Sequence, residues 1–430
     1  MEKRQSVSQG LLVSGIIDQK MYENSLFDLQ KSLDNLQQYR GLISTEDLET
    51  LQNIQHHFVE LLPKRGTLDM SRGNVSICFE HGEVKHFSSI TINQYKIFKN
   101  FTIDKLKRIN IFAGFNNSGK SSLLESVYFL TKQNDIVSFL EAIKLRNKLS
   151  SLDPVWLNEV FAQGDVIDIK GTFNGVETSI NFHKYEASNI DKKDDYLASY
   201  NLKATINDRK LDNTIHTFRF DTLKRENERV EHLCNSILKS PYFYNLKEVI
   251  ETYSKNTIYK NSESKTAIRL VIEFIKSEID PNIEDMRLYD VEDIERFIVD
   301  STQFKDKNLE ITNYGEGLQR IFEIALAFAY ARNGVVCIDE FETAIHYSLL
   351  VDFTKFIQEL AHEFNVQVFI TSHSKECIDA FVENGYGNNE ISAYFLKYKE
   401  DELKAIHTTG DKLKIYVDDM NFDLRGNRNG

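Results

Sequence analysis

Hydrophobic and polar positions along the 430-residue chain divide it into a helical start, a strand-rich middle and a second half in which strands and helices alternate. Between residues 25 and 63, apolar side chains recur at helical spacing, which predicts a hairpin of two helices. From Val75 the pattern becomes that of strands, and Asn174-Gly175 between the apolar runs 166–173 and 176–182 predicts a tight β-hairpin. We therefore predict an N-terminal helical appendage with its linker over 1–74, and a first lobe over 75–220.

The remaining chain is predicted to contain a charged insertion and then parallel β-α-β units. Residues 221–300 carry many charges, and their pattern favours a helical insertion with a solvated surface. Beyond it, helical patterns at 316–332, 349–364 and 375–384 alternate with apolar strands at 335–338, 366–371 and 391–398. This alternation indicates a parallel sheet. The predicted fold is α/β, with a mixed sheet, an antiparallel β lobe, the insertion and a second lobe over 301–430.

The stretch from Asn110 to Leu124 contains the pattern G-x-x-x-x-G-K-S. An apolar strand precedes it and an apolar helix follows it, which is the context of a phosphate-binding P-loop. In such a loop, backbone N–H groups and the helix N-terminus bind phosphates, the lysine reaches the β- and γ-phosphates, and the serine hydroxyl binds Mg²⁺. The predicted nucleotide-binding residues are Gly114, Asn116, Asn117, Ser118, Gly119, Lys120, Ser121 and Ser122.

Two later strands end in residues that suit chemistry on a nucleotide. Asp339 and Glu340 follow the apolar strand V-V-C-I, so Asp339 could hold Mg²⁺ while Glu340 deprotonates the attacking water. Exposed acids at a strand end are common, but downstream of a P-loop the pair is specific. His373 follows another apolar strand and could contact the γ-phosphate. Taken alone, a histidine at this position is more often a polar cap.

A second glycine-containing segment, T-N-Y-G-E-G-L-Q-R, precedes the helix pattern at 316–332. Gly315, Glu316 and Gly317 would present backbone N–H groups at that helix N-terminus, which is a second anion site. This site cannot easily serve the same nucleotide as the P-loop of its own subunit. We therefore expect it to close over the nucleotide of a second copy, in a homodimer or a higher homo-oligomer.

Composition narrows the protein class further. The net charge of −13 argues against a broadly basic surface for nucleic acid, although a local basic groove stays possible. The four cysteines, at 78, 234, 337 and 377, are scattered, as expected for reduced thiols of a cytosolic protein. We find no apolar run long enough to cross a bilayer and no signal-peptide pattern, so we predict a cytoplasmic protein without a membrane partner.

In their order, the four motifs resemble those of ABC-type ATPases of the SMC/RecF/OLD class, and the resemblance covers roughly residues 88–425. It implies an ABC-type ATPase head that hydrolyses ATP with Mg²⁺, with Glu340, Lys120 and His373 catalytic. It also implies Ser121, Asp339 and Gln163 on the metal, Gln163 being the candidate Q-loop glutamine. In D-E-F-E-T-A-I-H, the resemblance implies a role for Glu342 and His346. Asn313 stands where the signature motif usually carries serine.

The resemblance also suggests a biological setting. We find no TOPRIM-like nuclease pattern after Tyr398, so the chain looks like stand-alone OLD-like ATPases of two-gene phage-defence systems, such as the AriA subunit of PARIS. This implies an NTP-gated scaffold or sensor that controls a partner effector, for which a TOPRIM-type nuclease is the expected partner. The alternative is a RecF- or SMC-like recombination or repair ATPase that binds DNA directly.

Overall fold

The computed structural model describes residues 74–79, 84–147, 157–161, 163–186, 196–218, 224–225, 229–239, 262–291, 294–304, 309–399 and 402–420. The predicted helical hairpin at 25–63 lies outside these residues. The chain divides into two compact units, and nearly all described residues belong to the unit that spans 69–188, 198–216 and 224–430.

A central six-stranded sheet carries the P-loop. Its order is β11 (Ser236–Lys239), β15 (Val335–Ile338), β16 (Gln367–Ser372), β4 (Ile109–Gly114), β17 (Ile391–Lys399) and β18 (Glu402–Thr409). The first five strands are parallel, and β18 pairs antiparallel with β17 at the edge. Every residue of β4, β15 and β16 is buried, as expected for parallel strands that are covered on both faces. The predicted mixed sheet is confirmed.

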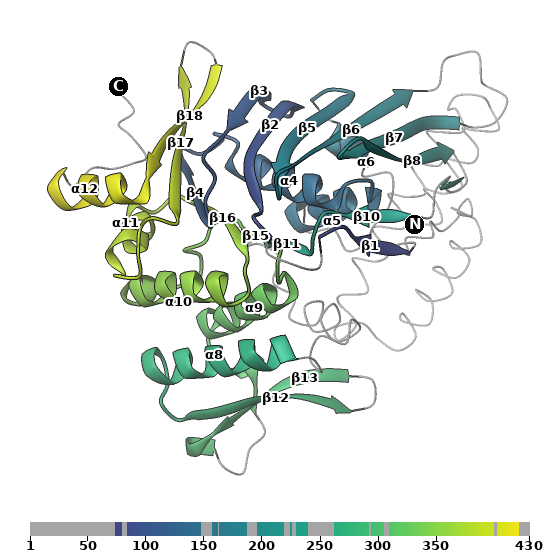
Figure 1. Cartoon of the computed structure of the whole chain (residues 1–430). Coiled ribbons are helices and arrows are strands. Elements are labelled where there is room, and N and C mark those ends of the chain that lie inside the picture. The colour runs from purple at the N-terminus through teal and green to yellow at the C-terminus, as the bar shows by residue number, and fades with distance from the viewer. Residues whose placement is uncertain are drawn as a thin grey trace, which may run out of the picture. The chain divides into compact units, whose positions relative to one another are not determined.

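A second, antiparallel sheet forms the predicted β lobe (Figure 1). Its order is β3 (Phe98–Ile103), β2 (Phe87–Tyr95), β5 (Val166–Phe173), β6 (Val176–Glu186), β7 (Tyr196–Ile206), β8 (Arg209–Phe218) and β9 (Lys224–Arg225). Asn174 and Gly175 connect β5 to β6 with φ angles of +52° and +77°, the positive values that a tight two-residue hairpin turn requires. The helix after the P-loop, α4 (Lys120–Lys132), packs against strands of both sheets.

Helices of the C-terminal half share a hydrophobic core with the central sheet. This core includes residues of α8 (Ser262–Glu278), α9 (Glu316–Tyr330), α10 (Leu350–Glu363), α11 (Lys375–Glu383) and α12 (Gly410–Met420). Two more helices, α5 (Ile136–Asn147) and α6 (Leu157–Val160), follow α4. Short 3₁₀ turns occupy Thr302–Phe304, Ile311–Asn313 and Tyr347–Leu349. Within the described ranges, no helix is long and apolar enough to cross a membrane.

The secondary structure of residues 221–300 differs from the predicted helical insertion. Only α8 is helical among the residues described there, whereas β10 (Val230–His232) pairs with β1 (Val75–Ile77) and β11 joins the central sheet. A further sheet contains β12 (Ile283–Val291), β13 (Ile294–Ser301) and β14 (Leu309–Glu310). The lobe boundaries at 74, 220 and 300 stay predictions.

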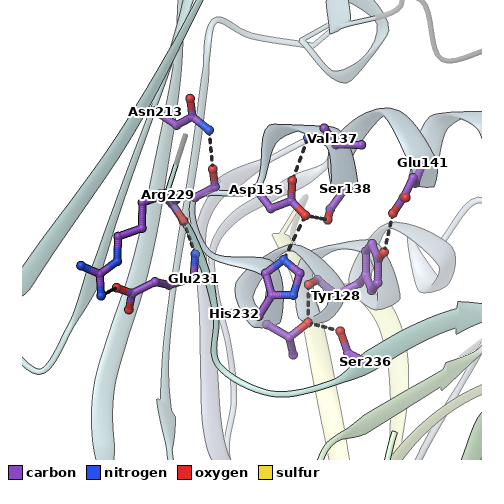
Figure 2. A network of polar contacts seen from close by, with 12 residues as sticks. Tyr128, Asp135, Val137, Ser138, Glu141, Asn213, Arg229, Glu231, His232 and Ser236 are labelled. Carbon is purple, nitrogen blue, oxygen red and sulfur yellow. Dashed lines mark hydrogen bonds and ion pairs between the residues drawn. The ribbon is translucent and has the colours of Figure 1, made fainter. Parts of the chain in front are cut away.

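Buried polar contacts hold β10 and the first residue of β11 against the segment where α4 ends and α5 begins (Figure 2). His232 Nε2 lies 2.9 Å from Asp135 Oδ2, and the hydroxyls of Ser236 and Thr131 lie 2.6 Å apart. The backbone N–H of Glu231 donates to the Asn134 side chain at 2.9 Å. These contacts with the end of α4 and the start of α5 depend on residues about 100 positions away, so local sequence pattern could not reveal them.

Candidate nucleotide-binding site

A cavity of about 800 Å³ opens beside the N-terminus of α4. It is lined by P-loop residues and by residues from four distant segments: Lys96, Ile97, Asn116, Asn117, Ser118, Gly119, Lys120, Ser121, Ser122, Gln163, Glu340, Glu342 and His373. The strands β4, β15 and β16 are parallel, so their carboxyl ends meet at one edge of the sheet. The structure thus brings together the predicted P-loop, Glu340, His373 and Gln163.

Backbone geometry explains why glycine occupies the end of the P-loop. Gly119 has a φ angle of +86°, and a Cβ there would lie 2.5 Å from Ile97 Cδ1. A larger residue would therefore be strained and would also collide with the turn between β2 and β3. Gly119 is the N-cap of α4, and no described side chain caps that helix. The first N–H groups of α4 are consequently well placed to bind an anion.

Lys120 presents a buried cation beside this helix terminus. Its Nζ donates to the carbonyl oxygens of Gly114 and Phe115, both at 2.9 Å. Burial lowers the pKa of Lys120 to about 8, although the nearby carboxylates of Asp339, Glu340 and Glu342 oppose the shift. An anionic phosphate in the cavity would favour the charged form of this side chain.

The acidic residues after β15 are held by Thr371, near the end of β16. The Thr371 hydroxyl donates to Asp339 Oδ1 at 2.5 Å and accepts the Glu340 backbone N–H at 2.9 Å. Glu340 lines the cavity and has a φ angle of +46°, which is unusual for a non-glycine residue. Asp339 is half-buried beside the cavity, whose described lining does not include it.

Glu342 connects the acidic segment to the segment that carries His373. Its Oε1 accepts the backbone N–H groups of His373 at 2.8 Å and of Ser374 at 3.1 Å. Burial, and next the charge of Lys120, lower the pKa of His373, which favours the neutral imidazole. The implied position of Glu342 near the site is therefore observed. His346 is exposed, and its Nδ1 lies 2.8 Å from the Ser348 hydroxyl, away from the residues that line the cavity.

The oxygen-rich lining fits Mg²⁺. Glu342 Oε2 is buried and has no hydrogen-bond donor among the described residues, although it belongs to a side chain that lines the cavity. Such an anionic oxygen, together with the Ser121 hydroxyl and the Glu340 carboxylate, is the donor type that Mg²⁺ prefers. In the described part of the chain, no three His, Cys, Asp or Glu side chains are grouped as a metal site by themselves. Phosphate oxygens would therefore have to complete the coordination.

The second predicted anion site lies apart from this cavity. Gly315, Glu316 and Gly317 do not belong to its described lining, and Gly315 is the N-cap of α9. A Cβ at Gly315 would meet no described atom within 4 Å, whereas one at Gly317 would lie 2.8 Å from the Ala344 carbonyl oxygen. The Asn313 side chain donates to the Glu310 carbonyl at 3.2 Å. The N-terminus of α9 is thus exposed and lies outside the described lining of the P-loop cavity.

Some residues of the site were not identified from sequence. Lys96 and Ile97 enter the cavity from the turn between β2 and β3, where Lys96 has a φ angle of +49°. The Lys96 ammonium lies 2.6 Å from the Glu125 carboxylate of α4. The sequence does show a basic residue, Lys96, in a hairpin turn before the P-loop strand. That pattern alone does not predict that the turn packs against the P-loop.

A P-loop on the central parallel sheet, acidic and histidine-bearing ends of neighbouring strands, and an added antiparallel sheet define an ABC-type P-loop ATPase. Residues 109–379 match the protein family described as "AAA domain, putative AbiEii toxin, Type IV TA system", and the chain belongs to that family.

Curated relatives and solved structures show more distant similarities. The chain is 25% identical over 378 residues to an ATP/GTP phosphatase of Helicobacter pylori, across 77% of this chain and 97% of that protein. It is 28% identical over 113 residues to an uncharacterized protein of Methanocaldococcus jannaschii, and the match covers 26% of this chain and 99% of that protein. Among solved structures, it is similar to an SMC head bound to the C-terminal winged-helix domain of ScpA, with a TM-score of 0.40 and 14% identity. That match covers 76% of this chain and 98% of the SMC chain. It is also similar to the recombination mediator RecF with a bound ATP analogue, with a TM-score of 0.41 and 11% identity. That match covers 76% of this chain and 100% of the RecF chain.

Proposed function

We propose that this chain is a Mg²⁺-dependent ATPase that dimerises around its nucleotide and controls a partner effector in anti-phage defence. The observation that carries the enzymatic part is the convergence of Lys120, Glu340 and His373 on one cavity. Lys120 provides a cation for the phosphates, Glu340 a general base, and His373 a neutral imidazole for the γ-phosphate. Ser121, Asp339 and Gln163 would hold Mg²⁺.

Bound Mg²⁺ would neutralise phosphate charge as the terminal phosphate leaves. The protein's own part is to orient the reactants and move one proton. The α4 N-terminus and Lys120 bind the phosphates, and the Glu340 carboxylate accepts the proton of the attacking water. The name of the Helicobacter relative, an ATP/GTP phosphatase, supports hydrolysis and makes GTP a second substrate to test.

Phosphate release from ATP and from GTP tests the enzymatic part directly. We expect release with Mg²⁺, loss of release with EDTA, and loss of nucleotide binding in Lys120→Ala, because removal of this ammonium leaves the phosphate charge uncompensated. Lys120→Arg, which keeps a cation, is the matched control. Wild-type activity in Lys120→Ala, or no turnover by the wild-type protein, would contradict the assignment.

The dimer is supported by the position of Gly315–Gly317. This segment ends in a helix N-terminus that is exposed and lies outside the lining of its own P-loop cavity. A second subunit related by two-fold symmetry would place each α9 N-terminus against the other subunit's phosphates, which gives two identical composite sites. ATP would then hold the two copies together until it is hydrolysed.

The defence role is supported by the family description, which refers to toxins of toxin–antitoxin systems. The likeness to OLD-like ATPases adds a TOPRIM-type nuclease as the expected effector. The test is co-expression with the product of the adjacent gene, followed by assays of DNA cleavage and of plaque formation. We expect the effector's activity to differ between the wild-type protein and Glu340→Gln.

Direct action on DNA is the competing outcome. With a net charge of −13, the chain should bind duplex DNA weakly and without nucleotide dependence. Fluorescence anisotropy with a labelled duplex, at a fixed salt concentration and with or without ATP, measures this. Tight ATP-dependent binding would favour the RecF- or SMC-like alternative.

A further inference from the structure

The catalytic glutamate occupies a backbone conformation that its neighbours must maintain. Glu340 has a φ angle of +46°, a region that non-glycine residues adopt at an energetic cost. Such a conformation persists only where the surrounding structure holds it. Neighbouring groups must therefore hold the peptide units on either side of Glu340.

Hydrogen bonds from two elements fix both peptide units. The Glu340 N–H donates to the Thr371 hydroxyl at 2.9 Å, and the next N–H, of Phe341, donates to the Thr371 carbonyl at 3.0 Å. In this second peptide unit, Arg320 Nη2 of α9 also donates to the Glu340 carbonyl, at 3.1 Å. Thr371 is fully buried and Arg320 is 9% exposed, so water competes little for these bonds.

The Thr371 hydroxyl also acts on the second acidic residue. It donates its single proton to Asp339 Oδ1 while its oxygen accepts the Glu340 N–H. One hydroxyl thus orients both the carboxylate expected to hold Mg²⁺ and the residue expected to take the proton. Valine has nearly the same shape as threonine but can neither donate nor accept here.

Arg320 is a buried cation held close to acidic groups. Burial lowers its pKa, while Glu323, Glu342, Glu340 and Asp339 favour its charged form. An arginine guanidinium stays protonated in a protein, so this side chain remains a donor to the Glu340 carbonyl. Arg320 lies in α9, five residues after its N-cap Gly315. Its hydrogen bond to Glu340 therefore connects the start of α9 to the acidic residues that follow β15.

We propose that Thr371 and Arg320 are positioning residues that together hold Asp339 and Glu340 for the hydrolysis proposed above, on which this inference rests. Neither side chain lines the cavity in the described part of the chain, so both act through the two acids. The Thr371 hydroxyl orients the Asp339 carboxylate and holds the backbone N–H of Glu340. The Arg320 guanidinium holds the backbone carbonyl of Glu340.

Two matched pairs isolate the Thr371 hydroxyl: wild type against Thr371→Val, and Thr371→Ser against Thr371→Ala. Each pair differs mainly in the hydroxyl. We expect kcat to fall about 10- to 100-fold in the variant without the hydroxyl, with KM nearly unchanged, as for other residues that orient metal ligands. Thr371→Ser should keep most of the wild-type kcat. Arg320→Lys, which keeps the charge but changes the donor geometry, should lower kcat in the same way.

A binding measurement gives a readout independent of turnover. Calorimetric titration with a non-hydrolysable ATP analogue, at increasing Mg²⁺, should show that Thr371→Val and Thr371→Ala need about 10-fold more Mg²⁺ for the same affinity. In EDTA, all variants should bind the analogue as the wild-type protein does. A hydroxyl that merely supported the fold would not produce this Mg²⁺ dependence.

The outcomes separate this inference from the proposed function. No hydrolysis by the wild-type protein, or full activity in Glu340→Gln, would overturn the proposed function and the inference with it. If the wild-type protein is active and Glu340→Gln is not, equal kcat within both Thr371 pairs overturns the Thr371 role alone. Unfolding of both variants that lack the hydroxyl, with Thr371→Ser folded, also overturns it. Wild-type kcat in Arg320→Lys overturns the Arg320 role.

Discussion

Gly315→Asp and Lys120→Ala, each inactive alone, are expected to restore part of the ATPase activity when mixed. The prediction follows from the proposed dimer, in which each site would combine one subunit's P-loop with the other subunit's α9 N-terminus. In a mixed dimer, one site receives both defects and the other receives neither. Random pairing of equal amounts makes about half of the dimers mixed, each with one of two sites intact, so about one quarter of the wild-type rate should return.

The structure selects Gly315 as the position to change. Its backbone is extended, with φ of −60° and ψ of 152°, and a side chain there meets no described atom within 4 Å. Aspartate is a favoured N-cap residue, so the helix itself should tolerate it. Against a partner's γ-phosphate at about 4 Å, its carboxylate would cost about 4 kcal/mol at an effective dielectric of 20, or about a thousand-fold in site closure. Gly317 is unsuitable, because substitution there would collide with the Ala344 carbonyl of its own subunit.

Phosphate release is measured across mixing ratios, with subunit exchange followed by energy transfer between labelled subunits. The recovered rate should be highest at equal amounts. Gly315→Ala, which adds a side chain without a charge, is the control and should stay active alone. No recovery despite demonstrated exchange, or full activity of wild-type protein that light scattering shows to be monomeric with ATP, would refute the shared site.

Three further predictions concern single residues. Glu340→Gln should bind ATP but hydrolyse it about 10²- to 10⁴-fold more slowly, since the amide cannot accept a proton; loss of binding in a folded variant would contradict this. Because the pKa of Lys120 is about 8, calorimetry in buffers of different ionisation enthalpy should show ATP binding coupled to uptake of about 0.1 proton at pH 7 and about 0.9 at pH 9. This uptake should vanish in Lys120→Arg, and equal uptake at both pH values would refute the shifted pKa. Gly119→Ala should lower the free energy of unfolding by about 2–4 kcal/mol, from its positive φ angle and its collision with Ile97, and an unchanged urea midpoint would argue against it.

Local signals in the sequence were sufficient where a motif sets its own geometry. The Asn174-Gly175 turn needs positive φ angles at both residues, and the hairpin forms where predicted. The strand before Lys120 and the helix after it likewise follow from an unbroken apolar pattern. Parallel strands bring their carboxyl ends to one edge, so Glu340 and His373 could be placed near the P-loop before the structure was known.

Sequence pattern was insufficient where long-range pairing decides the structure. The short strands β10 and β11 lie in a charged segment, and they form because β1, β15 and the polar groups around Asp135 provide partners. The covering turn at Lys96 and Ile97 also belongs to a segment whose contacts with the P-loop depend on the whole antiparallel sheet. In each case the energetically decisive partner is distant in sequence.

Glu340 combines a feature that the sequence predicts with one that it does not. Its identity as a candidate base can be read from an acidic pair after an apolar strand, but neither residue of that pair signals a left-handed backbone. That backbone depends on Thr371, from the strand that leads to His373, and on Arg320, from the helix that begins after Gly315. In the proposed dimer, the partner subunit would contact Gly315 before α9, and the γ-phosphate would contact His373 after β16. Each of these contacts would act on an element that also holds Glu340. In the proposed dimer, closure and the positioning of the proposed base would thus be linked through hydrogen bonds that no single motif contains.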